Sequence, residues 1–194
     1  MIMSSRRLQA AMLVLGLSLL SGNLLADGDD GISAWIRSWL TPPQSGVAPT
    51  DLKLYEQECG SCHFPYQPGL LPALSWKQII TSLDDHFSEN VSLEQGERIK
   101  IQNFLLDNSA GQINFGLPNK IMASQQDYPL PIRVTETQYF LHEHSEIPPR
   151  MVSGNSKVGS IGNCDHCHQR ARRGLYDEHD VLIPGYVRDR DYDD

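Results

Sequence analysis

The 194-residue sequence predicts a mainly α-helical protein, with a larger N-terminal domain and a smaller, largely irregular and helical C-terminal domain. Two segments, beginning at Trp76 and at Leu93, carry apolar residues at about the three-to-four-residue spacing of a helix face. Neither pair of cysteines lies in an alternating pattern of strands and helices. The second half is shorter and poorer in apolar residues, and one helix can be recognised in it.

We expect the chain to divide at the linker 111–131, which is rich in glycine and proline. The N-terminal domain then spans 27–110 and the C-terminal domain spans 132–188, followed by a flexible acidic tail at 189–194. So small a C-terminal segment is not expected to fold unless a bound group supplies part of its core.

The first 26 residues differ in composition from the rest of the chain. Arg6 and Arg7 precede an apolar stretch at 8–20, and Ala26 precedes an acidic run. This order is typical of a secretory signal peptide, which predicts cleavage after Ala26 and export to the periplasm. The alternative is an uncleaved anchor, but the apolar stretch is shorter than the roughly 20 residues that span a membrane.

The charge balance argues against nucleic acid as a partner. The full chain has a formal net charge of −8, and loss of the two leader arginines changes it to −10. The lysines and arginines are scattered and number 16 against 24 acidic residues, so no basic patch is available for phosphates. An acidic protein is instead expected to associate with a partner that has a basic face.

The four cysteines form two identical patterns, Cys-x-x-Cys-His, at 59–63 and at 164–168. In this pattern both thiols can form thioethers with the vinyl groups of a porphyrin, and the histidine that follows can bind the iron. We therefore predict two covalently bound haem c groups. The expected attachment residues are Cys59, Cys62, Cys164 and Cys167, and the expected proximal iron ligands are His63 and His168.

Three other uses of cysteine pairs were considered. A thioredoxin-like redox disulfide needs a strand and helix alternation that is missing around both motifs. A four-cysteine zinc site and a pair of structural disulfides are also conceivable in an exported protein. None of these alternatives accounts for both His63 and His168, each directly after its second cysteine.

The region around the first motif predicts two helices and a loop. Residues 51–62 are expected to be a helix that leads into the motif. Residues 65–72 contain three prolines and a glycine, so they are expected to form a loop over the edge of the haem. A second helix is expected from Trp76, with Ser75 as its N-cap.

Two further helices are predicted from capping patterns. Ser92 and Gln95 have the spacing of a capping box at the start of a helix that ends near Asp107. In the second half, Thr135 and Gln138 have the same spacing, and the helix that they open is expected to end before a Pro-Pro pair.

Two histidines on apolar helix faces are candidates for the second iron ligand of each haem. His86 follows Leu83 by three residues, on the face that carries the buried residues of its helix. His144 shares a face with Phe140 and Ile147. We predict that His86 and His144 are the distal ligands, so that both irons are bound by two histidines.

Other residues are weaker candidates for these positions. Met122 and Met151 lie in irregular stretches flanked by glycine or proline, although a thioether is a common distal ligand of c-type haems. His142 lies about half a turn from the face that carries His144. His142 and His179 remain alternatives for the second iron.

Further residues around these motifs make the sequence similar to a known family, the dihaem cytochromes c (DHC). The first half contributes Tyr55 before its motif, then Pro-Gly-Leu-Leu-Pro at 68–72 and His86-Phe87. The second half contributes Phe140 and His144 within the pattern Phe-x-x-x-His-x-Glu-Ile-Pro, then Asn163 before its motif. The resemblance extends from Tyr55 to Pro184.

The resemblance implies a bacterial periplasmic electron carrier, not an enzyme, with a class I cytochrome c-like N-terminal haem domain and a smaller C-terminal haem domain. It implies low-spin, bis-histidine irons with His86 and His144 as distal ligands. Redox partners in this family include a small oxygen-binding monohaem cytochrome and a membrane cytochrome b. The sequence departs from the family at Ser88, where glycine is commoner.

Two other functions are weighed against electron transfer. A di-haem enzyme such as a peroxidase needs one iron with an open distal face, and known examples are much longer chains. A haem-based sensor would need a signalling domain, which is not visible in the sequence. We rank electron carrier first, enzyme second and sensor third.

Overall fold

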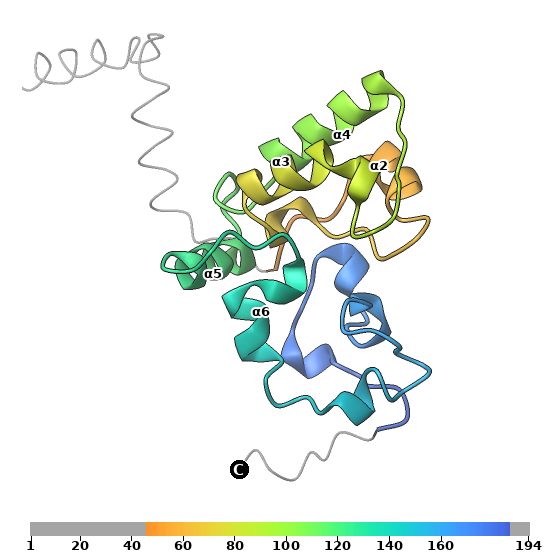
Figure 1. The fold of residues 1–194 in the computed structure, drawn as a ribbon. Coiled ribbons are helices and arrows are strands. Elements are labelled where there is room, and N and C mark those ends of the chain that lie inside the picture. Colours follow the sequence, from red (N-terminus) through yellow and green to blue (C-terminus); the bar gives the residue numbers. More distant parts are fainter. Residues whose placement is uncertain (1–45, 187–194) are drawn as a thin grey trace, which may run out of the picture. The chain divides into compact units, whose positions relative to one another are not determined.

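The computed structural model describes residues 46–186, and these residues fold into helices without strands (Figure 1). This confirms the prediction of a mainly α-helical fold, while the class I character of the N-terminal part stays a prediction. The predicted leader and the acidic tail lie outside the described residues. No helix within 46–186 has the length and apolarity that crossing a bilayer requires.

Three helices build the core of the first half. They are α2 (Lys53–Glu58), α3 (Ala73–Thr81) and α4 (Gln95–Asp107), and α3 packs on α4. Ile101 and Leu105 of α4 are 0% and 1% exposed and form the centre of the buried cluster. The indole of Trp76 in α3 is also buried, and its Nε1 donates a hydrogen bond of 2.7 Å to the Pro68 carbonyl. This bond ties the loop after the first motif to the core.

The helices begin elsewhere than the capping patterns predict. Pro72, with φ −62° and ψ 154°, precedes α3, so the predicted N-cap Ser75 is wrong and lies buried inside the helix. A Ser92 capping box is also wrong, because α4 begins at Gln95 after Glu94. Ser92 follows Val91, whose amide is bonded to the Leu83 carbonyl and keeps this segment outside the helix.

In the second half, α6 (Gln138–Glu143) is capped by Thr137 and not by the predicted Thr135. Thr137 Oγ1 accepts a hydrogen bond of 3.2 Å from the Phe140 amide. Thr135 lies within a 3₁₀ turn, η3 (Val134–Glu136), and this turn precedes α6 directly. Thr137 both ends η3 and caps α6, which the spacing of Thr and Gln does not reveal.

The segment 111–131, predicted to be a linker, contains helix α5 (Gly116–Gln125). Pro118 lies in the first turn of α5, where a missing amide hydrogen costs nothing. Ile121 of α5 is buried in the same cluster as Ile101, and α5 also packs on α6. All described residues belong to one compact unit, and its division into two haem domains stays a prediction.

The remainder of the second half consists of 3₁₀ turns and loops. The turns are η4 (Pro149–Met151), η5 (Cys164–His166), η6 (Ala171–Arg173) and η7 (Glu178–Asp180). Turn η6 ends at Gly174, whose φ of 73° favours glycine. The Gly174 carbonyl accepts a hydrogen bond of 2.9 Å from the Val47 amide, and a Cβ at Gly174 would lie 1.9 Å from the Val47 oxygen. The start of the described chain therefore lies directly against the segment after the second motif.

Candidate haem sites

The first motif follows helix α2 and is presented by its C-terminal end. Cys59 is the C-cap of α2, and the Gly60 amide continues the helical hydrogen bonding to the Glu56 carbonyl at 3.1 Å. A side chain at Gly60 would meet that carbonyl at 2.3 Å, so the turn requires glycine here. Cys59 is partly buried, whereas Cys62 is exposed. The turn thus places one thiol against the protein and the other at its surface.

His63 and His86 lie across from each other at the first site. Their ring centroids are 6.2 Å apart and their planes differ by 20°. An imidazole nitrogen lies about 2 Å from a metal that it binds, and the ring centroid lies about 1 Å behind that nitrogen, so two axial histidines on one metal should have centroids about 6 Å apart. The spacing of His63 and His86 fits a shared iron.

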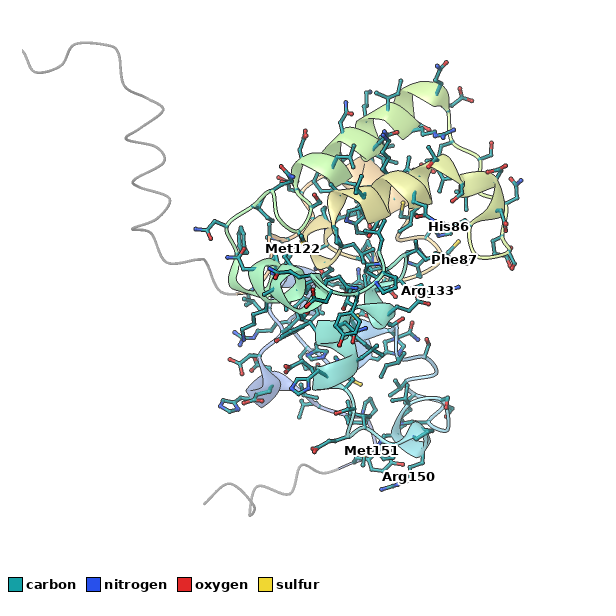
Figure 2. The ribbon with its side chains drawn as sticks, turned by 60° about the vertical axis from the view of Figure 1, so that its left-hand side comes forward. His86, Phe87, Met122, Arg133, Arg150 and Met151 are labelled. Carbon is teal, nitrogen blue, oxygen red and sulfur yellow. The ribbon has the colours of Figure 1, made fainter. Side chains whose placement is uncertain are left out.

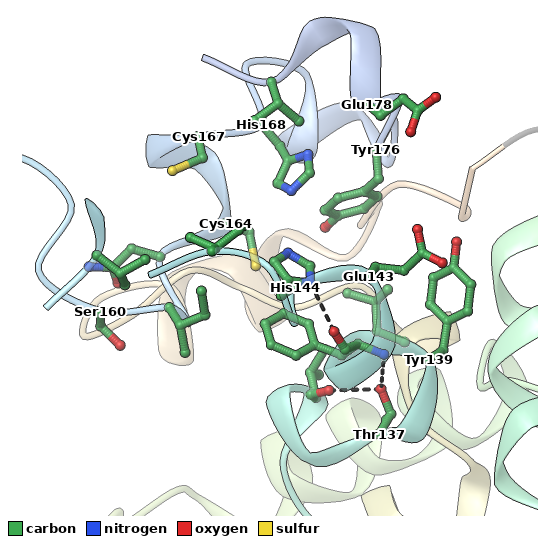
Figure 3. Close-up of a pocket in the computed structure, with 18 of the residues that line it drawn as sticks. Thr137, Tyr139, Glu143, His144, Ser160, Cys164, Cys167, His168, Tyr176 and Glu178 are labelled. Carbon is green, nitrogen blue, oxygen red and sulfur yellow. Dashed lines mark hydrogen bonds between the residues drawn. The ribbon is translucent and has the colours of Figure 1, made fainter. Parts of the chain in front are cut away.

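His144 and His168 have the same spacing at the second site. Their ring centroids are 6.1 Å apart, with planes at 65°. Figure 3 shows both rings directed into one cavity, together with the thiols of Cys164 and Cys167. The two sites therefore share the separation of paired axial ligands and differ in how the two rings are turned.

Hydrogen bonds to backbone carbonyls orient two of these four histidine rings. The Nδ1 of His63 lies 2.7 Å from the Phe64 carbonyl, and the Nδ1 of His144 lies 3.0 Å from the Phe140 carbonyl. A bond of this kind, with Nδ1–H as donor, leaves Nε2 as the lone-pair nitrogen that can bind a metal. The Nδ1 of His168 is buried and has no hydrogen-bond partner within 46–186.

The cavity at the second site has apolar walls from both halves of the chain. Leu70, Leu117 and Ile121 contribute from the first half and from α5. The second half contributes aliphatic residues, including Val134, Val152, Val158 and Ile183, together with aromatic and polar ones such as Phe140 and Glu143. Apolar walls around two cysteines and two opposed histidines suit a porphyrin, whose faces are apolar.

Burial shapes the protonation of the site histidines. Desolvation, followed by the nearby His144, lowers the pKa of His168 to about 4. Desolvation also lowers the pKa of His144 and of His86, and for His86 the neighbouring His63 and Arg133 act in the same direction. The neutral imidazole, which is the form that binds a metal, is favoured at all three positions.

The thiols do not have the properties of a redox dithiol. Burial raises the pKa of Cys59 to about 11, that of Cys164 to about 12 and also that of Cys167. A reactive dithiol needs a lowered thiol pKa, so the thioredoxin-like alternative is disfavoured. No disulfide joins any of the four cysteines, and no group of three or more potential ligands gathers around a protein-only metal site within 46–186. These observations also disfavour the disulfide and zinc alternatives.

The alternative iron ligands lie in less suitable places. His142 and His179 are exposed, whereas His144 is partly buried and its ring stacks on Phe140 at 3.9 Å. Met122 packs beside Gly111, with its sulfur 3.8 Å from where a Cβ there would be. Met151 lies in another part of the molecule from His86 (Figure 2).

A buried polar bridge that sequence reasoning missed joins the two sites. Gln67 is 1% exposed; its Nε2 donates to the Ala171 carbonyl at 2.6 Å, and its Oε1 accepts from the Tyr176 hydroxyl at 2.6 Å. The Tyr176 ring lies 5.4 Å from the His168 ring. Tyr66 lies 5.4 Å from His63, and its hydroxyl donates to the Gly162 carbonyl at 2.9 Å. Polar residues in a proline-rich loop give no sequence signal for such long-range contacts.

Comparisons with known proteins agree with these sites. A model of the family described as dihaem cytochrome c matches residues 55–176, more than half of the chain. A search of curated proteins found no match.

Similar solved structures are dihaem cytochromes c. A protein from Shewanella baltica OS155 is 38% identical, with a TM-score of 0.56, over 70% of this chain and 94% of its own. One from Rhodobacter sphaeroides is 33% identical, with a TM-score of 0.59, over 67% of this chain and 100% of its own. These similarities confirm two covalently bound c-type haems as the cofactors and make the protein an electron-transfer haem protein. The chain belongs to the dihaem cytochrome c family.

Proposed function

We propose that this chain is a periplasmic carrier of single electrons in which two histidines bind each iron. His63 and His86 would hold the first iron, and His168 and His144 the second. The observation that carries this proposal is the separation of the paired rings, 6.2 Å and 6.1 Å, because each is the spacing of two ligands on opposite sides of one metal.

Ligation of this kind suits electron transfer. When bound, each haem supplies an iron that gains and loses one electron. Two histidines per iron leave no coordination position for oxygen or peroxide. The His144 ring is also held in place, since it stacks on Phe140 and is bonded to the Phe140 carbonyl. Ligands that keep their places on oxidation and reduction favour fast electron exchange over bond-making chemistry.

An enzyme or a sensor would need one open iron. An open iron would be expected at the second site, because His142 and His179 are alternatives there to His144 as the distal ligand. The ring of His144 faces His168 inside the cavity, whereas His142 is exposed. We therefore favour a closed second site, and with it electron transfer over peroxidase or sensor activity.

The experiment that tests this proposal is a visible and near-infrared spectrum of the purified holoprotein, before and after carbon monoxide is added. We expect low-spin bis-histidine bands and no carbon monoxide shift at either haem within minutes, because carbon monoxide needs a free axial position. A high-spin component, or a shift in half of the haem, would disprove closed ligation and favour the enzyme or sensor.

The partners are proposed from the charge of the chain and from the family resemblance. The mature chain would carry a formal charge of −10, which is the full-chain −8 less two arginines, so a redox protein with a basic face is the expected partner. A small monohaem cytochrome and a membrane cytochrome b are the partner types that the family resemblance suggests. Reduction of a basic monohaem cytochrome by the reduced protein should slow by about tenfold between low and high salt, since screening removes the attraction. A stopped-flow rate that does not depend on salt, or that slows equally with an acidic cytochrome, would contradict electrostatic docking.

A further inference from the structure

The distal histidine of the first site lies at the start of a strained turn, residues 86–89. The His86 amide donates to the Glu89 carbonyl at 2.7 Å, and the Glu89 amide donates to the His86 carbonyl at 3.1 Å. The two residues between them, Phe87 and Ser88, have φ values of 56° and 79°. Turns with two central residues of positive φ favour Asn and Gly, and a bulky aromatic side chain is an outlier there. The backbone that carries His86 is therefore held in a conformation that its own sequence disfavours.

Side chains outside the turn hold it in this conformation. The Phe87 ring packs edge-on against the His86 ring, with centroids 4.9 Å apart. The guanidinium carbon of Arg133 lies 3.8 Å from the centre of the Phe87 ring, the geometry of a cation–π contact (Figure 2). Phe87, which is 37% exposed, thus contacts both the histidine that it follows and an arginine 46 residues further along the chain.

The position of Arg133 is set by the second half of the protein. Val134, the next residue, is buried in the main core at the start of η3. Nε of Arg133 lies 3.4 Å from a carboxylate oxygen of Glu136, one turn further on. The backbone at Arg133 is therefore fixed by residues outside the turn that its side chain covers.

We propose that Arg133 is a positioning residue for the first haem, which clamps Phe87 and so holds the strained turn with His86 facing His63. This inference rests on the proposed function, in which His86 is the distal ligand. Loss of the clamp would let the turn relax, and His86 would then leave the iron more often. Carbon monoxide could take its place on the reduced iron, with no electron gained or lost.

The test measures the slow uptake of carbon monoxide by the reduced holoprotein over hours, a rate limited by ligand release. Arg133→Gln should speed uptake at one haem about fivefold to tenfold. Arg150→Gln is the matched control, since it removes the same charge from an exposed arginine that Figure 2 shows in another part of the molecule, and it should leave the rate unchanged. Ser88→Gly should slow uptake below the wild-type rate, because glycine accepts a positive φ without strain.

A double-variant cycle separates the clamp from a general loss of stability. Phe87→Leu should speed uptake as Arg133→Gln does, and the double variant should be no faster than either single variant, because both remove the same contact. Additive effects, or equal acceleration at both haems, would overturn the clamp. If Arg133→Gln has the wild-type rate while His86→Ala binds carbon monoxide at once, the clamp is wrong and the ligation stands. If His86→Ala binds none, the ligation itself is wrong.

Discussion

His86→Ala is expected to open the first haem to carbon monoxide and to leave the second haem closed. About half of the total haem should then shift its absorption at once, since two equivalent haems contribute to the spectrum. The reason is geometric, because the ring centroids of His86 and His63 are 6.2 Å apart and His86 is the proposed second ligand of that iron. Met122, the nearest methionine in the sequence, packs beside Gly111 in another element. The same variant should lose half of the near-infrared intensity that is typical of bis-histidine iron.

Two companion variants make this result specific. His144→Ala should open the second haem in the same way. A protein that carries both His86→Ala and His144→Ala should therefore bind carbon monoxide at both irons. His142→Ala, two residues before His144 and exposed, should bind none. If His142→Ala opens the second haem, or if His86→Ala leaves ligand binding unchanged, the corresponding histidine is removed from the assignment.

Cys164→Ser combined with Cys167→Ser is expected to remove the second haem and to unfold the segment around it. Ile147, Ile161 and Ile183 line its cavity and are at most partly buried by the protein itself, so they would face water without the ring. The segment has one α-helix after α5, the six-residue α6, so little regular structure would persist without the haem. The measurements are intact mass and amide hydrogen exchange. The mass should fall by one haem, and exchange protection should disappear across 138–186.

The matched variant pair at the first motif has a different expected outcome. Cys59→Ser combined with Cys62→Ser should also cost one haem, but α3 and α4 should keep their exchange protection, because Ile101 and Leu105 are buried by protein and not by the cofactor. The intact mass of the wild-type protein also tests the predicted export, because cleavage after Ala26 would leave a chain that begins at Asp27. Full protection of 138–186 in a protein without the second haem would disprove its dependence on the cofactor.

The two predicted distal ligands show what periodicity alone can and cannot predict. His86 and His144 were predicted from apolar faces, but His86 lies after α3 has ended, at the end of the 3₁₀ turn η2 (Leu83–Asp85). His144 is likewise the C-cap of α6 and not part of its body. The apolar helix face predicts both residues, but the position of each is set by the turn in which its helix ends. A periodic pattern cannot show where a helix stops, because the stop depends on contacts made elsewhere.

The capping residues illustrate the same limit. Ser75, Ser92 and Thr135 all have favourable capping spacings, and none of them caps a helix. In the structure the helices α3, α4 and α6 instead follow Pro72, Glu94 and Thr137. Local propensity is a weak preference that tertiary contacts easily override.

The sequence by itself determined the chemistry that is local. Five consecutive residues at 59–63 and at 164–168 contain both attachment thiols and a histidine, so two covalent haems followed from the motifs alone. The mainly helical fold also followed, because helix periodicity is a property of neighbouring residues. Only the tertiary structure decided which residues that are far apart in the sequence come into contact. It brought His86 to His63 and His144 to His168, closed Arg133 over Phe87 and linked Gln67 to Tyr176. These contacts join residues more than 20 positions apart, and their geometry depends on how whole segments pack, which no short pattern records.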